Sequence, residues 1–288
     1  MNQISNTTGR GLSDFGLKYL AMVCMVLDHI EYFFSFTGKV PLFFSWIGRL
    51  AAPLFLFCLI EGFVHTHDRK KYFLRIYAIA ILMGFIQFSF YNIGHSLVRG
   101  DGFIPQNQML ASFSILLVVL QGFRWCEQKK WLPGLTAIVL PIILPYIITL
   151  FFTLCSTSGN HTQGFVLNLL IFTVLPCHSF IADGGTATLL CGIILYLFRK
   201  HPKRQALAFV LFCLLWDVAR CFLYFQDGLS VSFFFTEAYE WMEIFAVIPM
   251  LCYNGTRGHG SKRLFYWFYP IHIYILYALS CILFYFFF

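Results

Sequence analysis

The first apolar segment, Leu17 to Phe34, contains a lysine and a histidine at a spacing that fits an acyl-transfer site. Lys18 and His29 lie eleven positions apart, which on an α-helix is close to three whole turns and about 16 Å of rise. The two side chains therefore share one helix face, with the ammonium near one end and the imidazole far inside. A cation suits a phosphate group, and imidazole suits general-base work because it titrates near neutrality. An acyl-coenzyme A has this shape, with phosphates at one end and a thioester at the end of a long arm.

Charged residues in the first two apolar segments occur at matching depths. In a hairpin that turns at Gly38–Lys39, Asp28 lies about as far before the turn as Arg49 lies after it. Lys18 and Glu61 match in the same way. A charge inside a membrane costs at least about 2.5–3.5 kcal/mol and marks a candidate functional site. We predict two ion pairs, which either only hold the hairpin together or, for the deeper pair, also set the field around the histidine. Asp28 is adjacent to His29 in sequence, so the two side chains do not share a helix face, and direct orientation of the imidazole by Asp28 is the less favoured alternative to its pairing with Arg49.

The composition indicates a membrane protein. Hydrophobic residues make up 59% of the 288 residues and charged residues 11%, whereas a soluble domain holds about 25% charged residues. Apolar runs of about 20 residues, long enough to cross a bilayer, recur from Phe15 to Phe288. We therefore predict an all-α, polytopic membrane helical bundle, with 1–14 as a cytoplasmic tail and 15–288 as a single transmembrane domain.

About nine transmembrane helices are expected. The predicted spans are 15–36, 41–64, 73–92, 107–124, 132–154, 165–198, 206–225, 232–252 and 264–286. The segment 165–198 is too long for one ordinary span and is interrupted by PCHSFIADGG. We expect a broken or re-entrant helix there. Two full crossings would give ten helices, but they would place the basic loop that follows on the wrong side of the membrane.

The net charge of +7 is concentrated in a few loops. The basic clusters lie within Arg69–Arg75, Arg124–Lys130, Arg199–Arg204 and Arg257–Arg263. The loops between them carry almost no excess positive charge, which is the pattern of the positive-inside rule. The charge therefore favours a cell-membrane protein with a cytoplasmic amino terminus and argues against binding of nucleic acid.

A basic residue, ten residues and a histidine is the spacing typical of the integral-membrane family-3 acyltransferases, which this chain resembles. Three stretches more closely resemble the TraX family, which is associated with amino-terminal acetylation of conjugative pilin. These stretches are LKYLAMVCMVLDHI, the segment Arg49–Arg75, and the tail PMLCYNGTRGHGSKRLFYWFYPIHIYILYAL. They lie towards the two ends of the chain; the middle matches only in its hydropathy.

The resemblance implies an acyltransferase that uses acetyl-CoA and acts on a protein amino terminus such as that of a pilin. Lys18 and His29 match the acyltransferase motif. Asp28, Arg49, Glu61 and His272 match TraX-like positions, and Glu61 and His272 are expected to line the substrate cavity. Many family-3 enzymes have arginine where this chain has Lys18, and a lysine does not offer the same bidentate contact to phosphate.

Other polar residues are candidates by position. The cluster Arg69, Lys70, Lys71 and Arg75 follows the second span. It either sets the topology or clamps the phosphates of acetyl-CoA. Asn107, at the head of the fourth span, is a candidate for the far side of the substrate cavity. Asp217 and Arg220 face Glu237 and Glu240 across a later hairpin and are expected to form structural ion pairs.

No metal is expected. The pair His65 and His67 has no third ligand nearby in the sequence, and the ten cysteines are scattered singly without metal or disulfide spacing.

We hypothesise that His29 deprotonates the acceptor, or transiently carries the acetyl group, while Arg49 steadies developing negative charge. Asp28 is grouped with them through its ion pair. A glycan or lipid hydroxyl in the cell envelope is the alternative acceptor. The rival interpretations from other classes are a proton-coupled transporter, which would use the buried charges as a relay, and a non-catalytic assembly factor.

Overall fold

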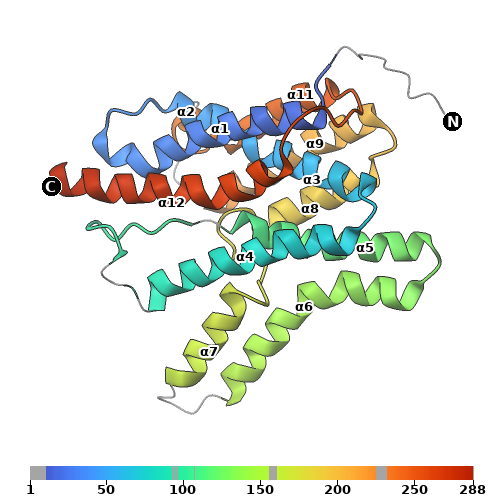
Figure 1. Ribbon diagram of the computed structural model, residues 1–288, viewed down its shortest axis with the longest axis horizontal. Coiled ribbons are helices and arrows are strands. Elements are labelled where there is room, and N and C mark those ends of the chain that lie inside the picture. Colours follow the sequence, from blue (N-terminus) through green and yellow to red (C-terminus); the bar gives the residue numbers. More distant parts are fainter. Residues whose placement is uncertain are drawn as a thin grey trace.

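The computed structural model describes residues 11–92, 94, 97–106, 108–155, 161–224 and 232–287. The described residues confirm the all-α bundle, with one isolated β-bridge between Leu12 and Tyr253. Five long helices carry most of the structure around the site described below (Figure 1). They are α1 (Asp14–Phe34), α3 (Ala51–His65), α4 (Arg69–Asn92), α5 (Met109–Glu127) and α12 (Lys262–Phe287).

Six helical segments in the described part of the chain are long and apolar enough to cross a membrane. They are Asp14–Thr37, Phe43–His65, Arg69–Asn92, Met109–Glu127, Trp131–Cys155 and Arg263–Phe287. All six correspond to predicted spans. A further predicted span, 206–225, falls largely within α9 (Pro202–Tyr224).

Two predicted spans consist of shorter pieces. The segment 165–198 forms α7 (His161–Phe172) and α8 (Gly185–Leu197), separated by a non-helical stretch as the sequence predicts. Pro176 lies in this stretch and cannot donate a helical hydrogen bond. Residues 232–252 form α10 (Phe233–Thr236), a 3-10 helix η3 (Tyr239–Ala246) and α11 (Val247–Leu251).

The second span is kinked where it approaches the first. It consists of α2 (Phe43–Gly48) and α3, with Arg49 at the junction. A Cβ atom on Gly48 would lie 2.3 Å from side-chain atoms of Asp28 in α1, too close for any side chain. Glycine is therefore required at this crossing, and it brings the junction directly against Asp28.

The start of α1 is tied to the loop that precedes α12. Ser13 caps the helix by accepting a hydrogen bond from the backbone N–H of Gly16 at 3.1 Å. The backbone N–H of Asp14 donates to Thr256 at 2.9 Å, and that of Phe15 donates to Arg257 at 3.1 Å. These bonds place the loop, and with it Arg257, beside the first turn of α1.

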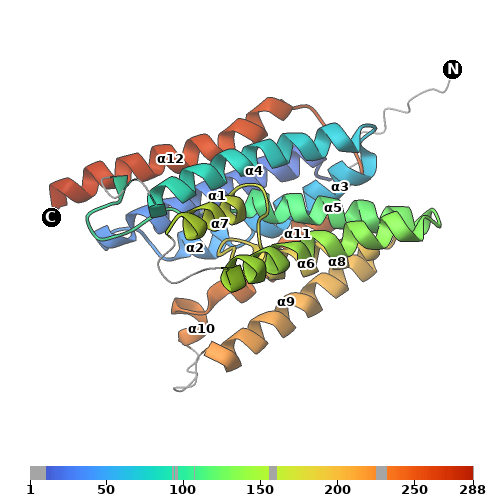
Figure 2. The same cartoon turned by 90° about the horizontal axis from the view of Figure 1, so that it is seen from below.

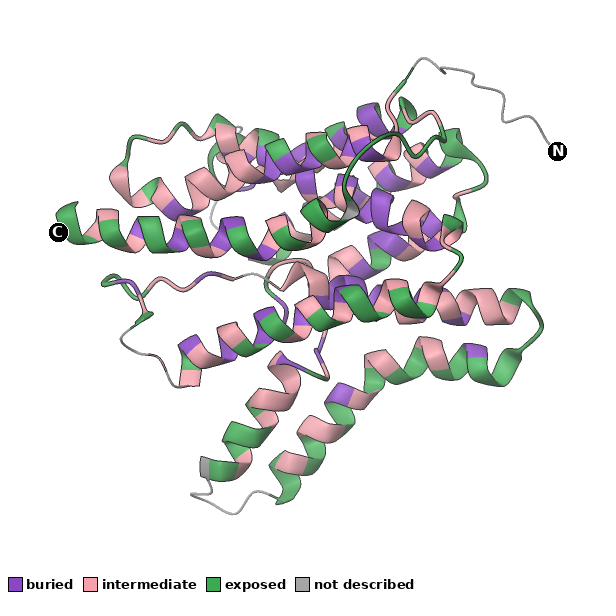
Figure 3. Ribbon diagram, in the orientation of Figure 1, coloured by how far each residue is buried: buried purple, intermediate pink, exposed green. Residues whose placement is uncertain are grey.

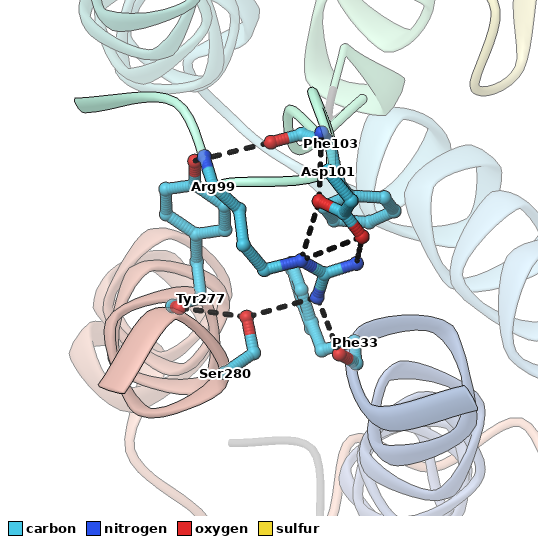
Figure 4. A network of polar contacts seen from close by, with 6 residues as sticks. All are labelled: Phe33, Arg99, Asp101, Phe103, Tyr277 and Ser280. Atoms are coloured by element: carbon cyan, nitrogen blue, oxygen red, sulfur yellow. Dashed lines mark hydrogen bonds and ion pairs between the residues drawn. The ribbon is translucent and has the colours of Figure 1, made fainter. Parts of the chain in front are cut away.

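The other end of α1 is covered by residues 97–106, here called the cap segment, which Arg99 anchors (Figure 4). The Arg99 guanidinium donates three hydrogen bonds to Asp101, at 2.8, 2.9 and 3.1 Å, and one to the Phe33 carbonyl in α1 at 2.8 Å. It also donates to the Ser280 hydroxyl in α12 at 3.3 Å. The backbone N–H of Arg99 donates to the Tyr277 hydroxyl at 3.1 Å. One buried arginine therefore joins the cap segment to two helices.

Replacing Arg99 by alanine is expected to destabilise the protein by about 3 kcal/mol, because it leaves a carboxylate and two acceptors in nearby helices unpaired. The apparent melting temperature in detergent should fall by roughly 5–10 °C. Arg99→Lys should recover only part of the loss, since an ammonium does not reproduce the forked contact with Asp101. Arg204→Ala, at an exposed position on α9, is the matched control.

The contact between Arg99 and Asp101 predicts that the stability of the protein depends on pH. Hydrogen bonds from Arg99 hold the pKa of the Asp101 carboxyl below its ordinary value of about 3.9. A lowered pKa in the folded state stabilises the protein at pH values above the ordinary one, and the contribution is lost as the pH falls through the lowered value. The gap in melting temperature between wild type and Arg99→Ala should therefore narrow below about pH 4. A gap that is absent at neutral pH, or unchanged in acid, would contradict this role for Arg99.

The helix pair α6 (Trp131–Cys155) and α7 diverges from the rest of the bundle (Figures 1 and 2). In α6, only 6% of an 18-residue apolar stretch is buried, whereas in α5 the corresponding share is 56%. Both helices are mostly exposed or intermediate along their length (Figure 3). Because the exposed residues of α6 are largely apolar, this helix is suited to contact with lipid.

Candidate functional site

A cavity of about 480 Å³ lies beside α1. It is lined by residues of α1, the α2–α3 junction, α3, α4, α5 and α12, together with Asp183, part of η3 and the loop 253–257. Lys18 and His29 both line it, as the shared helix face predicts. We call its two ends the Lys18 end and the His29 end. The volume is within the range of about 300–1,000 Å³ that is usual for small-molecule sites.

His29 forms a hydrogen-bonded pair with His272. The Nδ1 atom of His29 lies 2.7 Å from Nε2 of His272, and the two rings stack with centroids 4.9 Å apart. On its other side, His272 Nδ1 lies 2.7 Å from the carbonyl oxygen of Phe268 in the preceding turn of α12. His272 does not itself line the cavity; it supports His29 from behind.

These contacts fix the tautomers of two neutral histidines. A carbonyl oxygen only accepts, so His272 Nδ1 must carry the proton that it donates to Phe268. Neutral His272 then has a lone pair on Nε2, which accepts a hydrogen bond from Nδ1–H of His29. The remaining nitrogen of His29, Nε2, is therefore unprotonated and is available as a base. The sequence alone did not reveal this pairing, because the two residues are 243 positions apart.

Asp28 and Arg49 form the ion pair that their matching depths predict. Both line the cavity beside His29. The Arg49 guanidinium also lies over the Tyr239 ring, 5.5 Å from its centroid. Its Nε–H is buried and has no hydrogen-bond partner within the described residues. The Arg49 guanidinium as a whole lines the cavity beside its partner Asp28.

At the Lys18 end, the predicted ion pair of Lys18 and Glu61 does not form; Lys18 pairs with Asp14 on its own helix instead. Lys18 Nζ lies 2.6 Å from Asp14, one turn earlier on the same helix, and 5.4 Å from the centre of the Phe15 ring. Glu61 instead lies 3.6 Å from His65. An acid four residues before a lysine on one helix is a favourable neighbour, and depth matching between two helices does not take it into account. Glu61 still lines the same cavity as Lys18.

The basic loop contributes less to the cavity than the sequence suggested. Of its four predicted phosphate ligands, Arg75 lines the cavity, but Arg69, Lys70 and Lys71 are not among the lining residues. Arg69 donates to the Phe63 carbonyl at 3.1 Å, Lys71 pairs with Asp68 at 3.1 Å, and Lys70 is exposed.

Arg257, which sequence reasoning assigned only to a topology-setting cluster, lines the cavity instead. Its guanidinium lies 5.6 Å from the centre of the Phe15 ring. Its place in the YNGTRGHG part of the TraX-like tail was the signal for it in the sequence.

Three acidic residues that sequence reasoning did not assign to the site also line the cavity: Asp183, Glu240 and Glu243. The predicted pairing across the α9–η3 hairpin is confirmed for Arg220 and Glu240, at 3.5 Å. Asn107, the last predicted cavity residue, lies outside the described residues. Within the described part of the chain, no group of three or more histidine, cysteine or acidic side chains is placed to hold a metal ion.

The fold and the cavity together define a polytopic helical membrane protein with a charged, histidine-containing site among its helices. The chain belongs to the TraX protein family, whose family model matches residues 14–280. It is 25% identical to a probable fimbrial assembly protein FimC, serogroup H1, from Dichelobacter nodosus, over 92% of this chain and 94% of the relative. No solved structure matches the chain.

Proposed function

We propose that this protein is a membrane acyltransferase that transfers an acetyl group from acetyl-CoA to a protein amino terminus. The observation that carries the proposal is the histidine pair at one end of a cavity that has cationic side chains at the other. Lys18, Arg75 and Arg257 line the Lys18 end together with the carboxylates of Asp14 and Glu61, and the excess of positive charge there would bind the phosphates of coenzyme A. The distance of about 16 Å along α1 from Lys18 to His29 suits the pantetheine arm, which would bring the thioester to His29.

The proposed reaction uses the two histidines and Arg49. Nε2 of His29 removes a proton from the acceptor nitrogen as that nitrogen attacks the thioester carbonyl. His29 then carries two protons, and the hydrogen bond from its Nδ1–H to His272 stabilises the cation. The carbonyl oxygen becomes an oxyanion, and the Arg49 guanidinium that lines the cavity supplies the positive charge that stabilises it. When the C–S bond breaks, the proton on Nε2 passes to the thiolate of coenzyme A.

The positive-inside pattern of the basic clusters supports an orientation in which the Lys18 end faces the cytoplasm, where acetyl-CoA is made. The FimC relative is described as a probable fimbrial assembly protein. A pilin subunit is therefore the acceptor that we propose. An O-acetyltransferase acting on an envelope glycan or lipid is the second candidate, because the same base and oxyanion donor would serve a hydroxyl acceptor.

Binding of acetyl-CoA tests the proposal. The purified protein in lipid nanodiscs should bind radiolabelled acetyl-CoA at micromolar concentration, and the double variant Arg75→Gln, Arg257→Gln should weaken binding at least 10-fold through the loss of two cations. Arg204→Gln, an exposed change outside the cavity, is the control. A wild-type protein that binds no acetyl-CoA at millimolar concentration would overturn the proposal and favour a transporter or an assembly factor.

A further inference from the structure

The two ends of the cavity differ in charge. At the His29 end, four carboxylates stand against one guanidinium, that of Arg49. The carboxylates belong to Asp28, Asp183, Glu240 and Glu243. Asp28 pairs with Arg49, and Glu240 pairs with Arg220. Asp183 and Glu243 make no ion pair with any described residue.

Asp183 is held next to the histidine pair by α12. The Tyr269 hydroxyl donates to Asp183 at 3.4 Å, and Tyr269 lies three residues before His272 on the same helix face. The rings of Tyr269 and His272 have centroids 6.1 Å apart. One turn of α12 therefore supports both the carboxylate of Asp183 and the imidazole that orients His29.

The broken helix between α7 and α8 fixes the backbone at Asp183. Gly184 and Gly185, which follow it, have φ angles of +106° and +56°, values that favour glycine. The N–H of Gly185 donates to the buried Ser112 hydroxyl in α5 at 2.8 Å. A Cβ on Gly184 would lie 2.9 Å from that hydroxyl. The stretch PCHSFIADGG, which separates α7 from α8, thus holds the Asp183 carboxylate at a defined position beside the cavity.

We propose that Asp183 binds the acceptor as an ammonium ion and takes its first proton. This inference rests on the acetyl-transfer function proposed above. An amino terminus arrives as R–NH₃⁺ and must lose one proton before its nitrogen can attack and a second as the amide forms. His29 Nε2 supplies one proton acceptor, so a second is required, and Asp183 is a cavity-lining carboxylate without a cationic partner among the described residues. A hydroxyl acceptor would need only one.

The proton balance is complete with these two groups. The first proton goes from the ammonium to the Asp183 carboxylate and leaves to solvent after product release. The second goes to His29 and then to the sulfur of coenzyme A. The charged and titratable groups that act on Asp183 are Asp28, Arg49, Tyr32 and Tyr269.

The test uses an apolar peptide of about 20 residues with a free amino-terminal alanine, and the same peptide beginning with a lactyl group, which has a hydroxyl in place of the amine. With wild type in nanodiscs, the amine peptide should be acetylated and the hydroxyl peptide at least 100-fold more slowly. Asp183→Asn should raise the KM for the amine peptide and lower kcat/KM about 100-fold at pH 7, yet bind acetyl-CoA normally.

The pH profile separates this role from a structural one. In Asp183→Asn the amine must lose its first proton to solvent, so kcat/KM should rise towards the wild-type value between pH 7 and pH 9, across the α-amino pKa of about 8. Glu237→Gln, an exposed acid outside the cavity, should keep the wild-type profile. A wild-type KM and profile for Asp183→Asn, or no alkaline recovery despite normal acetyl-CoA binding, would overturn the inference while leaving the acetyltransferase intact.

If Asp183→Asn fails to bind acetyl-CoA, the Tyr269→Phe variant tests the inference instead. It removes only the hydroxyl that donates to the Asp183 carboxylate. It should raise the KM for the amine peptide several-fold, and an unchanged KM would count against the inference. Equal rates on the amine and hydroxyl peptides would also overturn it. Failure of wild type to acetylate either peptide or to bind acetyl-CoA would instead remove the proposed function.

Discussion

The His29→Ala variant should lose acetyl transfer by about 1,000-fold, within the range for removal of a general base, and should still bind acetyl-CoA with near wild-type affinity. The alanine removes the nitrogen that accepts the proton but leaves the cationic end of the cavity untouched. Transfer is measured with radiolabelled acetyl-CoA and an amine-bearing peptide, and binding is measured by equilibrium dialysis. His67→Ala, at an exposed loop position, is the matched control.

His272→Phe should produce a smaller loss of about 100-fold. Phenylalanine retains a ring that stacks on His29 but accepts no hydrogen bond, so the tautomer of His29 is no longer fixed and its cation is no longer stabilised. His272→Gln, whose amide oxygen can accept from Nδ1–H of His29, should recover part of the activity. Full activity in His29→Ala would remove the mechanism, and equal activity in the phenylalanine and glutamine variants would show that His272 acts through packing alone.

The contacts that the sequence predicted correctly are those set by one helix or by one turn. The shared face of Lys18 and His29 follows from helical periodicity alone. The Asp28–Arg49 pair follows from two spans joined by a short turn at Gly38, where φ is +64°. In both cases the distance along the chain is short enough for helix geometry to decide which side chains meet.

The contacts that it missed depend on how distant helices pack. The support of His29 by His272 requires α12 to lie beside α1, which no local pattern specifies. Asp183 reaches the cavity because a broken helix folds back beside α5 and α12. The comparison of depths in the membrane pairs Lys18 with Glu61 because it considers only residues on different helices. Asp14 lies one turn before Lys18 on the same helix, so the two side chains meet without any tertiary contact.

Aromatic residues and the cap segment lie beyond the His29 end of the cavity. Beyond His29, α1 continues through Phe33 into an aromatic cluster with Phe90 and Tyr277, and the cap segment is anchored there by Arg99. Phe33 packs against His29, with ring centroids 5.9 Å apart. In the proposed reaction, exclusion of water by this packing would strengthen the electrostatic contacts of the site and limit hydrolysis of the thioester.

The second large effect concerns the ion pair of Asp28 and Arg49. Arg49→Gln should lower transfer about 100- to 1,000-fold, the usual cost of losing an oxyanion donor, and should reduce stability by about 3 kcal/mol, because it leaves the largely buried Asp28 carboxylate unpaired. Transfer is measured as above, and stability from the apparent melting temperature in detergent.

A double variant separates the two roles of the pair. Asp28→Asn combined with Arg49→Gln removes both charges, so most of the lost stability should return, since no unpaired charge remains. Activity should not return, because the donor to the oxyanion is still missing. Recovery of both stability and transfer would mean that the pair only holds α1 against the α2–α3 junction. Gly48→Ala provides a further check: its Cβ would displace Asp28 while Arg49 is kept, so transfer should fall even though both charges remain in the chain.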